Sequence, residues 1–219
     1  MTNKIRNMKK IILIITAVAL IINFSNAQEN NTDSRDQMHL GIKIGANLSN
    51  VYDAQGQEFN ADPKFGFVAG GFIAIPIGKY LGVQPEVLFS QKGFQATGTI
   101  LGSSYNFTRT TNYIDVPLLV QLKPSEFITL MAGPQFSYLI KQTDVFVNSI
   151  YSEVQQQEFK NDNLRRNILC FLGGVDLNYN HLVIGLRAGW DVQNNNGDGT
   201  SDTPRYKNVW YQATIGCRF

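Results

Sequence analysis

The stretch RYKNVWYQATIGCRF, residues 205–219, alternates between two kinds of side chain. The apolar set is Val209, Tyr211, Ala213, Ile215, Cys217 and Phe219. The second set is polar or small apart from one Trp, and consists of Asn208, Trp210, Gln212, Thr214, Gly216 and Arg218. Successive side chains of a strand point to opposite faces. The stretch therefore predicts a strand with one apolar face and one wetter face.

This alternation continues to the final residue, which is aromatic. A chain that ends in an alternating strand with a terminal Phe resembles the signal by which bacterial outer-membrane barrels are recognised for insertion. The residues that would form this signal are Tyr211, Ala213, Ile215, Cys217 and Phe219. A strand of an ordinary β-sandwich is the alternative, and the rest of the chain decides between the two.

The beginning of the chain has the form of a secretory signal peptide. Basic residues are followed by the uncharged run Ile11–Ile22 and by the small residues before Gln28. The run is shorter than the roughly 20 residues of a membrane helix, which disfavours an uncleaved anchor. We therefore predict a signal peptide at residues 1–27, a polar and disordered lead-in at 28–38, and one domain at 39–219.

The charge balance changes when the leader is removed. The whole chain has 19 Lys and Arg against 17 Asp and Glu. Four of the basic residues lie in the leader, so the mature chain carries a formal charge of −2. Without clustered Lys and Arg, the mature chain gives no indication of nucleic-acid binding.

Alternating segments recur along the whole mature chain. We predict eight strands, at residues 39–50, 65–77, 81–97, 104–123, 127–143, 166–179, 182–192 and 205–219. Long connections follow the first, fifth and seventh strands, at Val51–Lys64, Asp144–Arg165 and Gln193–Pro204. The connections after the second, fourth and sixth strands are short. Asp144–Arg165 either contains a short helix around Ser152–Phe159 or extends its hairpin.

The sequence thus predicts an all-β fold, an eight-stranded antiparallel up-and-down transmembrane β-barrel of OmpA/OmpX-like architecture with short periplasmic turns and longer outer loops. Helices and closed barrels are the structures that satisfy their backbone in lipid, and short turns alternating with long loops are typical of such barrels. Two girdles of aromatic residues are expected at the membrane interfaces. They are Tyr80, Phe127, Tyr179 and Phe219 on the periplasmic side, and Phe65, Phe94, Tyr138 and Trp190 on the outer side.

Four segments resemble the PorT-like outer-membrane β-barrel proteins of Bacteroidota. They are GIKIGANLSN at residues 41–50, PEVLFSQKG at 85–93, YIDVPLL at 113–119 and GPQ at 133–135. Together they extend the resemblance over essentially all of the mature chain. The resemblance implies an eight-stranded barrel in the cell outer membrane, and it does not imply any particular activity. One branch of that family is tied to assembly of a secretion apparatus.

Charges of both signs occupy the less apolar face of the predicted strands. They are Lys43, Glu86, Lys92, Asp115, Lys123, Asp176, Arg187 and Arg218. An eight-stranded barrel is just wide enough for its own side chains to fill the interior. We therefore expect these residues to pair across the lumen as a structural network. A narrow ion path or a ligand site is the alternative.

No constellation for catalysis, metal binding or cofactor binding is recognisable. Both histidines, His39 and His181, fall at periplasmic strand ends without an obvious Ser and acid partner. The loop that starts at Asn194 imitates a calcium loop, but Arg205 stands where the ligating Glu should be. Cys170 and Cys217 are predicted to face opposite sides of the barrel wall and to remain free thiols.

A structural or interaction role, exercised through the long outer loops, is the function that the sequence favours. The expected partners are outer-membrane lipid, the barrel-assembly machinery during insertion, and envelope or secretion-system proteins. A soluble periplasmic or secreted lipocalin-like barrel that binds a small apolar ligand is the first alternative. A narrow pore is the second.

Overall fold

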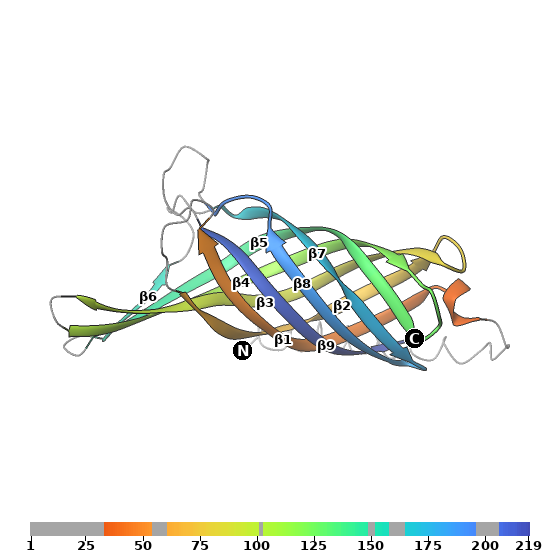
Figure 1. Cartoon of the computed structure of the whole chain (residues 1–219), viewed down its shortest axis with the longest axis horizontal. Helices are drawn as coiled ribbons and strands as arrows, with labels where there is room; N and C mark the ends of the chain where they lie inside the picture. Colours follow the sequence, from red (N-terminus) through yellow and green to blue (C-terminus); the bar gives the residue numbers. More distant parts are fainter. Residues whose placement is uncertain (1–32, 54–60, 101–102, 149–151, 158–164, 196–205) are drawn as a thin grey trace, which may run out of the picture.

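Eight of the described strands close into a barrel (Figure 1). The computed structural model describes residues 33–53, 61–100, 103–148, 152–157, 165–195 and 206–219. The barrel strands are β1 (His39–Asp53), β2 (Ala61–Pro76), β3 (Leu81–Ile100), β4 (Ser103–Leu122), β5 (Ile128–Asn148), β7 (Asn167–Tyr179), β8 (Leu182–Asp191) and β9 (Tyr206–Arg218). Each pairs antiparallel with its chain neighbour, except that β7 follows β5, and β1 pairs with β9 to close the ring.

The two ends of the barrel differ in their connections. At one end, here called the turn end, short turns join β2 to β3, β4 to β5 and β7 to β8. The last of these is the two-residue turn Asn180-His181, in which Asn180 has a φ of 51°. Asn tolerates this left-handed conformation better than most residues. The opposite end, here called the loop end, has the longer connections between β1 and β2, β6 and β7, and β8 and β9, as the sequence predicts, but only two residues separate β3 from β4.

The two faces of the wall follow the predicted alternation. In β9, Trp210 is completely buried and its neighbour Tyr211 is 63% exposed. In β8, Arg187 is buried and Leu186 is exposed. Charged residues thus point into the barrel, together with a buried apolar cluster that includes Leu119, Leu172 and Trp210, and the exposed large apolar residues point out of it. This is the reverse of a lipocalin-like barrel, whose apolar face lines an internal cavity.

Strands β3, β4 and β5 continue past the loop end of the barrel, where one further strand joins them to form a sheet (Figure 1, left). This protruding sheet consists of residues 91–100 of β3, 103–112 of β4, 141–148 of β5 and all of β6 (Ser152–Gln157). Along its length β5 changes partner, because it pairs with β7 up to Tyr138 and with β6 from Gln142 onward. The predicted helix around Ser152–Phe159 is therefore wrong, and the alternative of an extended hairpin is correct.

A β-bulge in β5 marks the base of the protruding sheet. Asn112 of β4 pairs with Lys141, and the next residue, Tyr113, pairs with Leu139, so Ile140 is the extra residue of β5. Inward positions in β5 are odd-numbered up to Leu139 and include Gln142 after the bulge. An extra residue inverts the alternation. If the alternation of residues 129–139 continued without the bulge, Gln142 and Asp144 would lie on the outer face.

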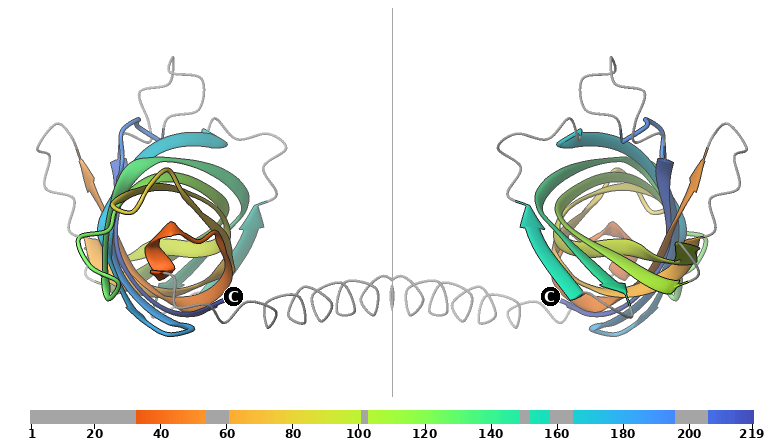
Figure 2. Two further views of the ribbon diagram at one scale, coloured as in Figure 1. Left: turned by 90° about the vertical axis from the view of Figure 1, so that its right-hand side faces the viewer. Right: turned by 90° about the vertical axis from the view of Figure 1, so that its left-hand side faces the viewer.

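The lead-in differs from the prediction where the structure describes it. Residues Ser34–Asp36 form a short 3-10 helix, η2, that lies across the mouth of the turn end (Figure 2, left). The predicted disorder of 28–38 is thus wrong for residues 33–38, because polar contacts to the turns hold this segment. Residues 28–32 and the predicted signal peptide at 1–27 lie outside the described residues.

One predicted girdle residue is misplaced. Phe94 is buried on the inner face, where its ring lies 5.9 Å from that of Phe107 and 5.7 Å from that of Tyr206. The reason is that Phe94 shares the parity of Glu86 and Lys92, which also point inward. Exposed aromatic side chains of the two girdles include Phe65, Tyr80, Phe127, Tyr138, Tyr179 and Trp190.

Candidate functional site

Glu86 of β3 connects three other strands through the centre of the barrel. Lys43 Nζ of β1 donates to Glu86 Oε1 at 2.8 Å, and Arg187 Nη1 of β8 donates to Glu86 Oε2 at 2.8 Å. Arg187 Nη2 also donates to Asp176 Oδ2 of β7 at 3.3 Å. All four side chains are buried. Two positive and two negative charges make this group, here called the Glu86 group, neutral as a whole.

Amide side chains extend the Glu86 group toward the turn end. Gln84 Nε2 donates to Glu86 Oε1 at 2.6 Å, and Gln121 Nε2 donates to Gln84 Oε1 at 2.6 Å. Toward the loop end, Gln212 Nε2 donates to Asn47 Oδ1, and Asn47 Nδ2 donates to Ser90 Oγ, both at 3.0 Å. Polar side chains therefore fill successive levels of the lumen.

A second ion pair lies nearer the loop end. Lys92 Nζ of β3 is 3.1 Å from Asp115 Oδ2 of β4, and both side chains are 1% exposed. The same ammonium group lies 3.6 Å from the ring centroid of Trp210 and 5.1 Å from that of Tyr113. A desolvated cation over an aromatic face is stabilised electrostatically by the ring. Trp210, the one large apolar residue on the more polar face of the terminal strand, thus packs against Lys92 in the lumen.

Six of the eight predicted lumen charges come together in these two groups, and two do not. Lys123 Nζ donates to the backbone oxygen of Arg35 at 2.9 Å. Arg218 Nε donates to the backbone oxygen of Asn180 at 2.9 Å. Both residues stand at the ends of their strands, where the inner face opens into the mouth of the barrel. Their inclusion in one lumen network was therefore wrong.

Asp191 is a buried lumen charge that the sequence prediction omitted. Its Oδ1 accepts from Cys170 Sγ at 3.2 Å, and its Oδ2 accepts from the backbone N–H of Asn208 at 2.8 Å. Asn195 Nδ2 donates to the same Oδ2 at 3.3 Å. The parity shared with Arg187 places Asp191 on the inner face and could have identified it. Cys170 and Cys217 are both free thiols, as predicted.

An arginine cluster covers the loop end of the lumen. Arg109 of β4 donates through Nε and Nη2 to the two carboxylate oxygens of Asp144 at 2.8 and 2.7 Å. Its Nη1 donates to the hydroxyl of Tyr206 at 3.0 Å. The guanidinium carbon lies 5.4 Å from the ring centroid of Phe107. The sequence prediction missed this cluster because Asp144 was assigned to a loop.

Charged residues also hold η2 at the turn end. Asp33 Oδ2 is 2.6 Å from Arg35 Nη2 and 2.9 Å from Lys79 Nζ in the turn between β2 and β3. The hydrogen bond from Arg35, followed by that from Lys79, holds the pKa of Asp33 well below its ordinary value. The hydrogen bond with Asp33 in turn raises the pKa of Arg35 and of Lys79. We call these three residues, together with Tyr80, the latch.

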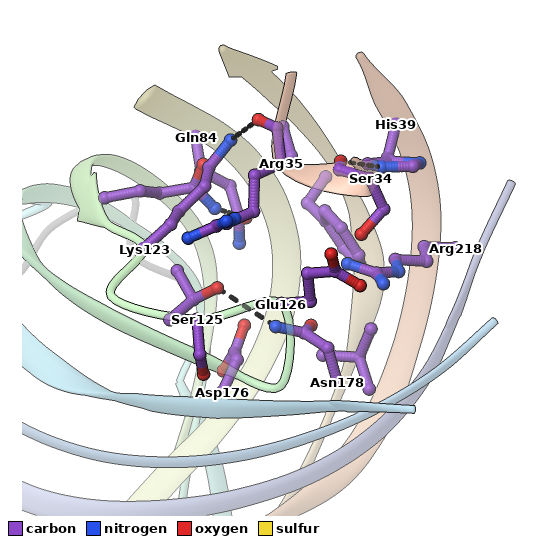
Figure 3. Close-up of a pocket in the computed structure, with 15 residues that line it drawn as sticks. Ser34, Arg35, His39, Gln84, Lys123, Ser125, Glu126, Asp176, Asn178 and Arg218 are labelled. Atoms are coloured by element: carbon purple, nitrogen blue, oxygen red, sulfur yellow. Dashed lines mark hydrogen bonds between the residues drawn. The ribbon is translucent and has the colours of Figure 1, made fainter. Parts of the chain in front are cut away.

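Beneath η2 lies a small polar chamber with a volume of about 30 Å³ (Figure 3). Its lining includes Arg35 from the lead-in, Lys123 and Glu126 from the turn after β4, and Asp176 of the Glu86 group. A cavity of this volume holds a few water molecules at most. The chamber is therefore too small for an organic ligand while η2 is in place.

The two histidines make backbone contacts at the turn end. His39 Nε2 lies 2.9 Å from the backbone oxygen of Ser34, and His181 Nδ1 lies 2.9 Å from that of Arg218. Among the described residues, no group of three or more His, Cys, Asp and Glu could hold a metal ion. Within the same residues, no helix is long and apolar enough to cross a bilayer.

The residues of the predicted insertion signal lie on the outer face of β9. Tyr211 and Ile215 are more than half exposed, and Ala213 between them is also exposed. Phe219 follows the end of β9 and pairs with Leu40 of β1, donating its backbone N–H at 2.7 Å. This bond fastens the last residue of the chain to the first strand.

The chain is similar to several solved structures. Ail, the attachment invasion locus protein of Yersinia pestis, solved with the heparin analogue sucrose octasulfate, is 16% identical with a TM-score of 0.50, and the match covers 84% of this chain and 99% of that chain. Neisserial surface protein A is 9% identical with a TM-score of 0.47, covering 82% and 97%. The N-terminal β-barrel domain of OprF from Pseudomonas aeruginosa is 10% identical with a TM-score of 0.41, covering 84% and 100%.

The sequence comparisons add the family. None of the curated proteins matches this chain. A family model described as the outer membrane protein beta-barrel domain matches residues 26–196, which is more than half of the chain. The outward apolar face and the inward charges of the closed barrel agree with that match. The chain belongs to the outer membrane protein β-barrel domain family.

Proposed function

We propose that this protein is a sealed, non-enzymatic scaffold of the outer membrane that presents the protruding sheet to a partner outside the membrane. The observation that carries the proposal is the neutral Glu86 group, which spans the lumen from β1 to β8 with every charge paired. A lumen filled in this way leaves the surface beyond the membrane as the place where the protein acts.

Two further observations support a sealed lumen. The Lys92–Asp115 pair fills the level nearer the loop end, and the Arg109 cluster covers that end. At the turn end, η2 lies across the mouth. A narrow pore would need a continuous water path through these levels.

Conductance measurements test the sealed lumen. Purified protein is reconstituted into planar bilayers beside a known porin as positive control. We expect no stepwise currents above the baseline of protein-free bilayers. Reproducible current steps that increase in number with the amount of protein would favour the pore instead.

The protruding sheet is the surface that we propose for the partner. Its outer face is mixed: Gln91 Nε2 donates to Asn112 Oδ1 across β3 and β4, and Val147 of β5 is 45% exposed. Residues 94–96 of β3 still pair with β2, and the four residues 97–100 extend about 13 Å further at about 3.3 Å per residue. A sheet that extends past the other strands is well placed for contacts with envelope proteins.

Photo-crosslinking in cells tests this surface. A photoreactive residue replaces Thr108 on the protruding sheet or, as the matched control, Leu186 on the lipid-facing wall. We expect a discrete crosslinked protein band from position 108 and none from position 186. Equal patterns from both positions, or bands from neither, would contradict a partner on the sheet.

Within its family, the chain resembles the PorT-like proteins. We infer that the chain is a PorT-like member, supported by the segments at residues 41–50, 85–93, 113–119 and 133–135. A role in a secretion apparatus would follow for one branch of that group. Deletion of the gene followed by measurement of secreted protein tests this role, and unchanged secretion would exclude it.

Export and insertion complete the proposal. We infer that residues 1–27 are removed as a signal peptide and that Tyr211, Ala213, Ile215, Cys217 and Phe219 guide the barrel-assembly machinery. N-terminal sequencing of the outer-membrane protein should begin at Gln28. Deletion of Phe219 should leave more of the protein outside the outer-membrane fraction, whereas Ile215→Leu should not.

A further inference from the structure

The segment of residues 33–38 contacts two separate turns of the barrel. Lys123 Nζ donates to the backbone oxygen of Arg35 at 2.9 Å, and Arg35 Nη1 donates to the backbone oxygen of Pro124 at 3.4 Å. These contacts join the segment to the turn between β4 and β5. Asp33 reaches Lys79 in the turn between β2 and β3, where the guanidinium of Arg35 also lies 5.2 Å from the ring centroid of Tyr80.

The contacts of this segment are polar, and those to Lys79 and to the backbone of Pro124 are exposed to water. None of the residues of η2 is buried, and the side chain of Lys79 is 45% exposed. Ion pairs near the surface are weakened by competing water and by salt. Within the described residues 33–38, no apolar side chain is buried against the barrel, and Met38 is exposed. The segment is therefore held by contacts that can open and close again.

The segment covers the polar chamber and, through it, the Glu86 group. Ser34 and Arg35 line the chamber from above, and Asp176 lines it from below. Asp176 Oδ1 is buried and has no hydrogen-bond partner among the described residues, while Oδ2 binds Arg187. Thr129, which is 6% exposed, lines the same chamber and accepts from Asn178 Nδ2 at 3.0 Å. If the segment left, water would reach the lower end of the ion-pair group.

We propose that the turn end is a docking site for a short charged peptide, and that residues 33–38 of the chain itself occupy it as a removable lid over the Glu86 group. The occupant is identified by its contacts: an acid and a guanidinium two residues apart match Lys79, Tyr80 and the backbone oxygen of Pro124. Opening of the lid admits water from the periplasmic side to Asp176 without disturbing the closed ring of strands.

Cysteine accessibility tests the lid. In a background carrying Cys170→Ser and Cys217→Ser, Thr129→Cys reports on the chamber and Ser90→Cys, fully buried higher in the lumen, is the matched reporter. A small charged thiol reagent is applied to the barrel in micelles, and heat-modifiable gel mobility verifies folding. We expect Arg35→Ala to raise the labelling rate at position 129 at least tenfold and to leave the rate at position 90 unchanged.

Two controls distinguish the lid from general loosening. Lys207→Ala removes an exposed cation that binds the backbone oxygen of Val192 near the loop end, and it should leave both rates unchanged. When the latch residues are unchanged, about 1 M salt should weaken the ion pairs of the latch, because the Debye length falls to about 3 Å. The labelling rate should then rise at position 129 and not at position 90. Equal rates at position 129 in all samples, or parallel increases at both reporters, would overturn the lid.

Peptide complementation tests the docking site itself. A barrel that lacks residues 28–38 is mixed with a synthetic peptide of residues 30–38, and the labelling rate at position 129 is measured. The peptide should restore protection in a concentration-dependent manner, and the same peptide carrying Arg35→Ala should not. A barrel that the peptide fails to protect at any concentration would contradict a docking site at the turn end.

Discussion

Glu86 is the residue on which the interior of the barrel depends most. Its two oxygens accept hydrogen bonds from Lys43 and Arg187, which belong to strands on different sides of the lumen. Buried ion pairs add little net stability compared with apolar packing, but the loss of one partner leaves an uncompensated buried charge. The pairs are therefore interdependent, because the loss of any one charge leaves another buried charge without a partner.

Substitution of Glu86 tests this interdependence. Glu86→Ala leaves Lys43 and Arg187 with only Asp176 to balance them, and should lower the free energy of unfolding by about 3–5 kcal/mol. The measurement is denaturant unfolding in lipid vesicles, with Ile44→Val on the exposed outer face as control. The double variant Glu86→Ala/Arg187→Ala should lose less than the sum of the two single variants. Strict additivity would show that the two side chains do not act as a pair.

Asp33 should titrate below its ordinary pKa of 3.8, because Arg35 and Lys79 stabilise its charged form. A carboxylate whose pKa is lower when folded adds stability above its unfolded pKa and loses it as the pH falls through the folded value. The latch should thus be intact from neutral pH down to about pH 4 and weaken below that. Nuclear magnetic resonance of the Asp33 carboxyl carbon gives the midpoint, and Arg35→Ala should move it back toward 3.8.

Because of the bulge in β5, strict alternation would have placed Asp144 on the outer face even if the predicted strand had been extended to this residue. The alternation in residues 127–140 places Ile128, Leu130 and Ile140 outward, in agreement with their exposure. The extra residue at Ile140 then inverts the alternation, and Asp144 turns inward to meet Arg109. A pattern of period two contains no information on where such an insertion lies. The pairing partner is needed to locate it.

Deletion of Ile140 tests the bulge. Without this residue, Leu139 and Lys141 would still face Tyr113 and Asn112, so the ladder would become regular and Asp144 would remain inward. We expect a heat-modifiable barrel of near-normal stability. Deletion of Ile114, which lies in β4 at almost the same height and pairs on both sides, should prevent folding. Similar behaviour of the two deletions would contradict this account.

The strand boundaries show where local sequence is sufficient. The alternation of apolar residues predicted the eight barrel strands, since the membrane requires an apolar outer face at each level. It underestimated β3 and β5, which reach Ile100 and Asn148, because the outer face of the protruding sheet mixes polar residues with Val147 and carries no continuous apolar signal. The lead-in was missed for a related reason: Arg35 finds its partners in turns about 45 and 90 residues away.

At the scale of the molecule, the polar lumen was predictable as a face but not as a set of contacts. Parity placed Lys43, Glu86, Asp176 and Arg187 on the inner side, and closure of the barrel then brought them together. Which charges meet depends on the stagger of the strands, which one sequence does not reveal. Lys123 and Arg218 share the inner face and still lie beyond the filled lumen.

Amide hydrogen exchange should divide the molecule at the bulge. Residues 113–122 of β4 lie in the barrel wall, whereas residues 103–112 lie in the protruding sheet, where β5 pairs with β6 in place of β7. Exchange requires local opening, which is easier where contacts are fewer. We expect protection in β4 to fall at about Asn112, as measured by mass spectrometry on the reconstituted protein. Uniform protection along β4 would imply that the protruding sheet and the barrel open together.

The pairing of β1 with β9 determines when this protein can fold. The hydrogen bond between Gln212 and Asn47 spans 165 residues, and that between Arg187 and Glu86 spans 101. Contacts so distant along the chain form slowly, because the entropy of closing the intervening loop is lost first. β1 therefore lacks one of its two neighbours until β9 pairs with it. Until the ring closes, the inner face of the wall is open and the lumen charges are exposed to water.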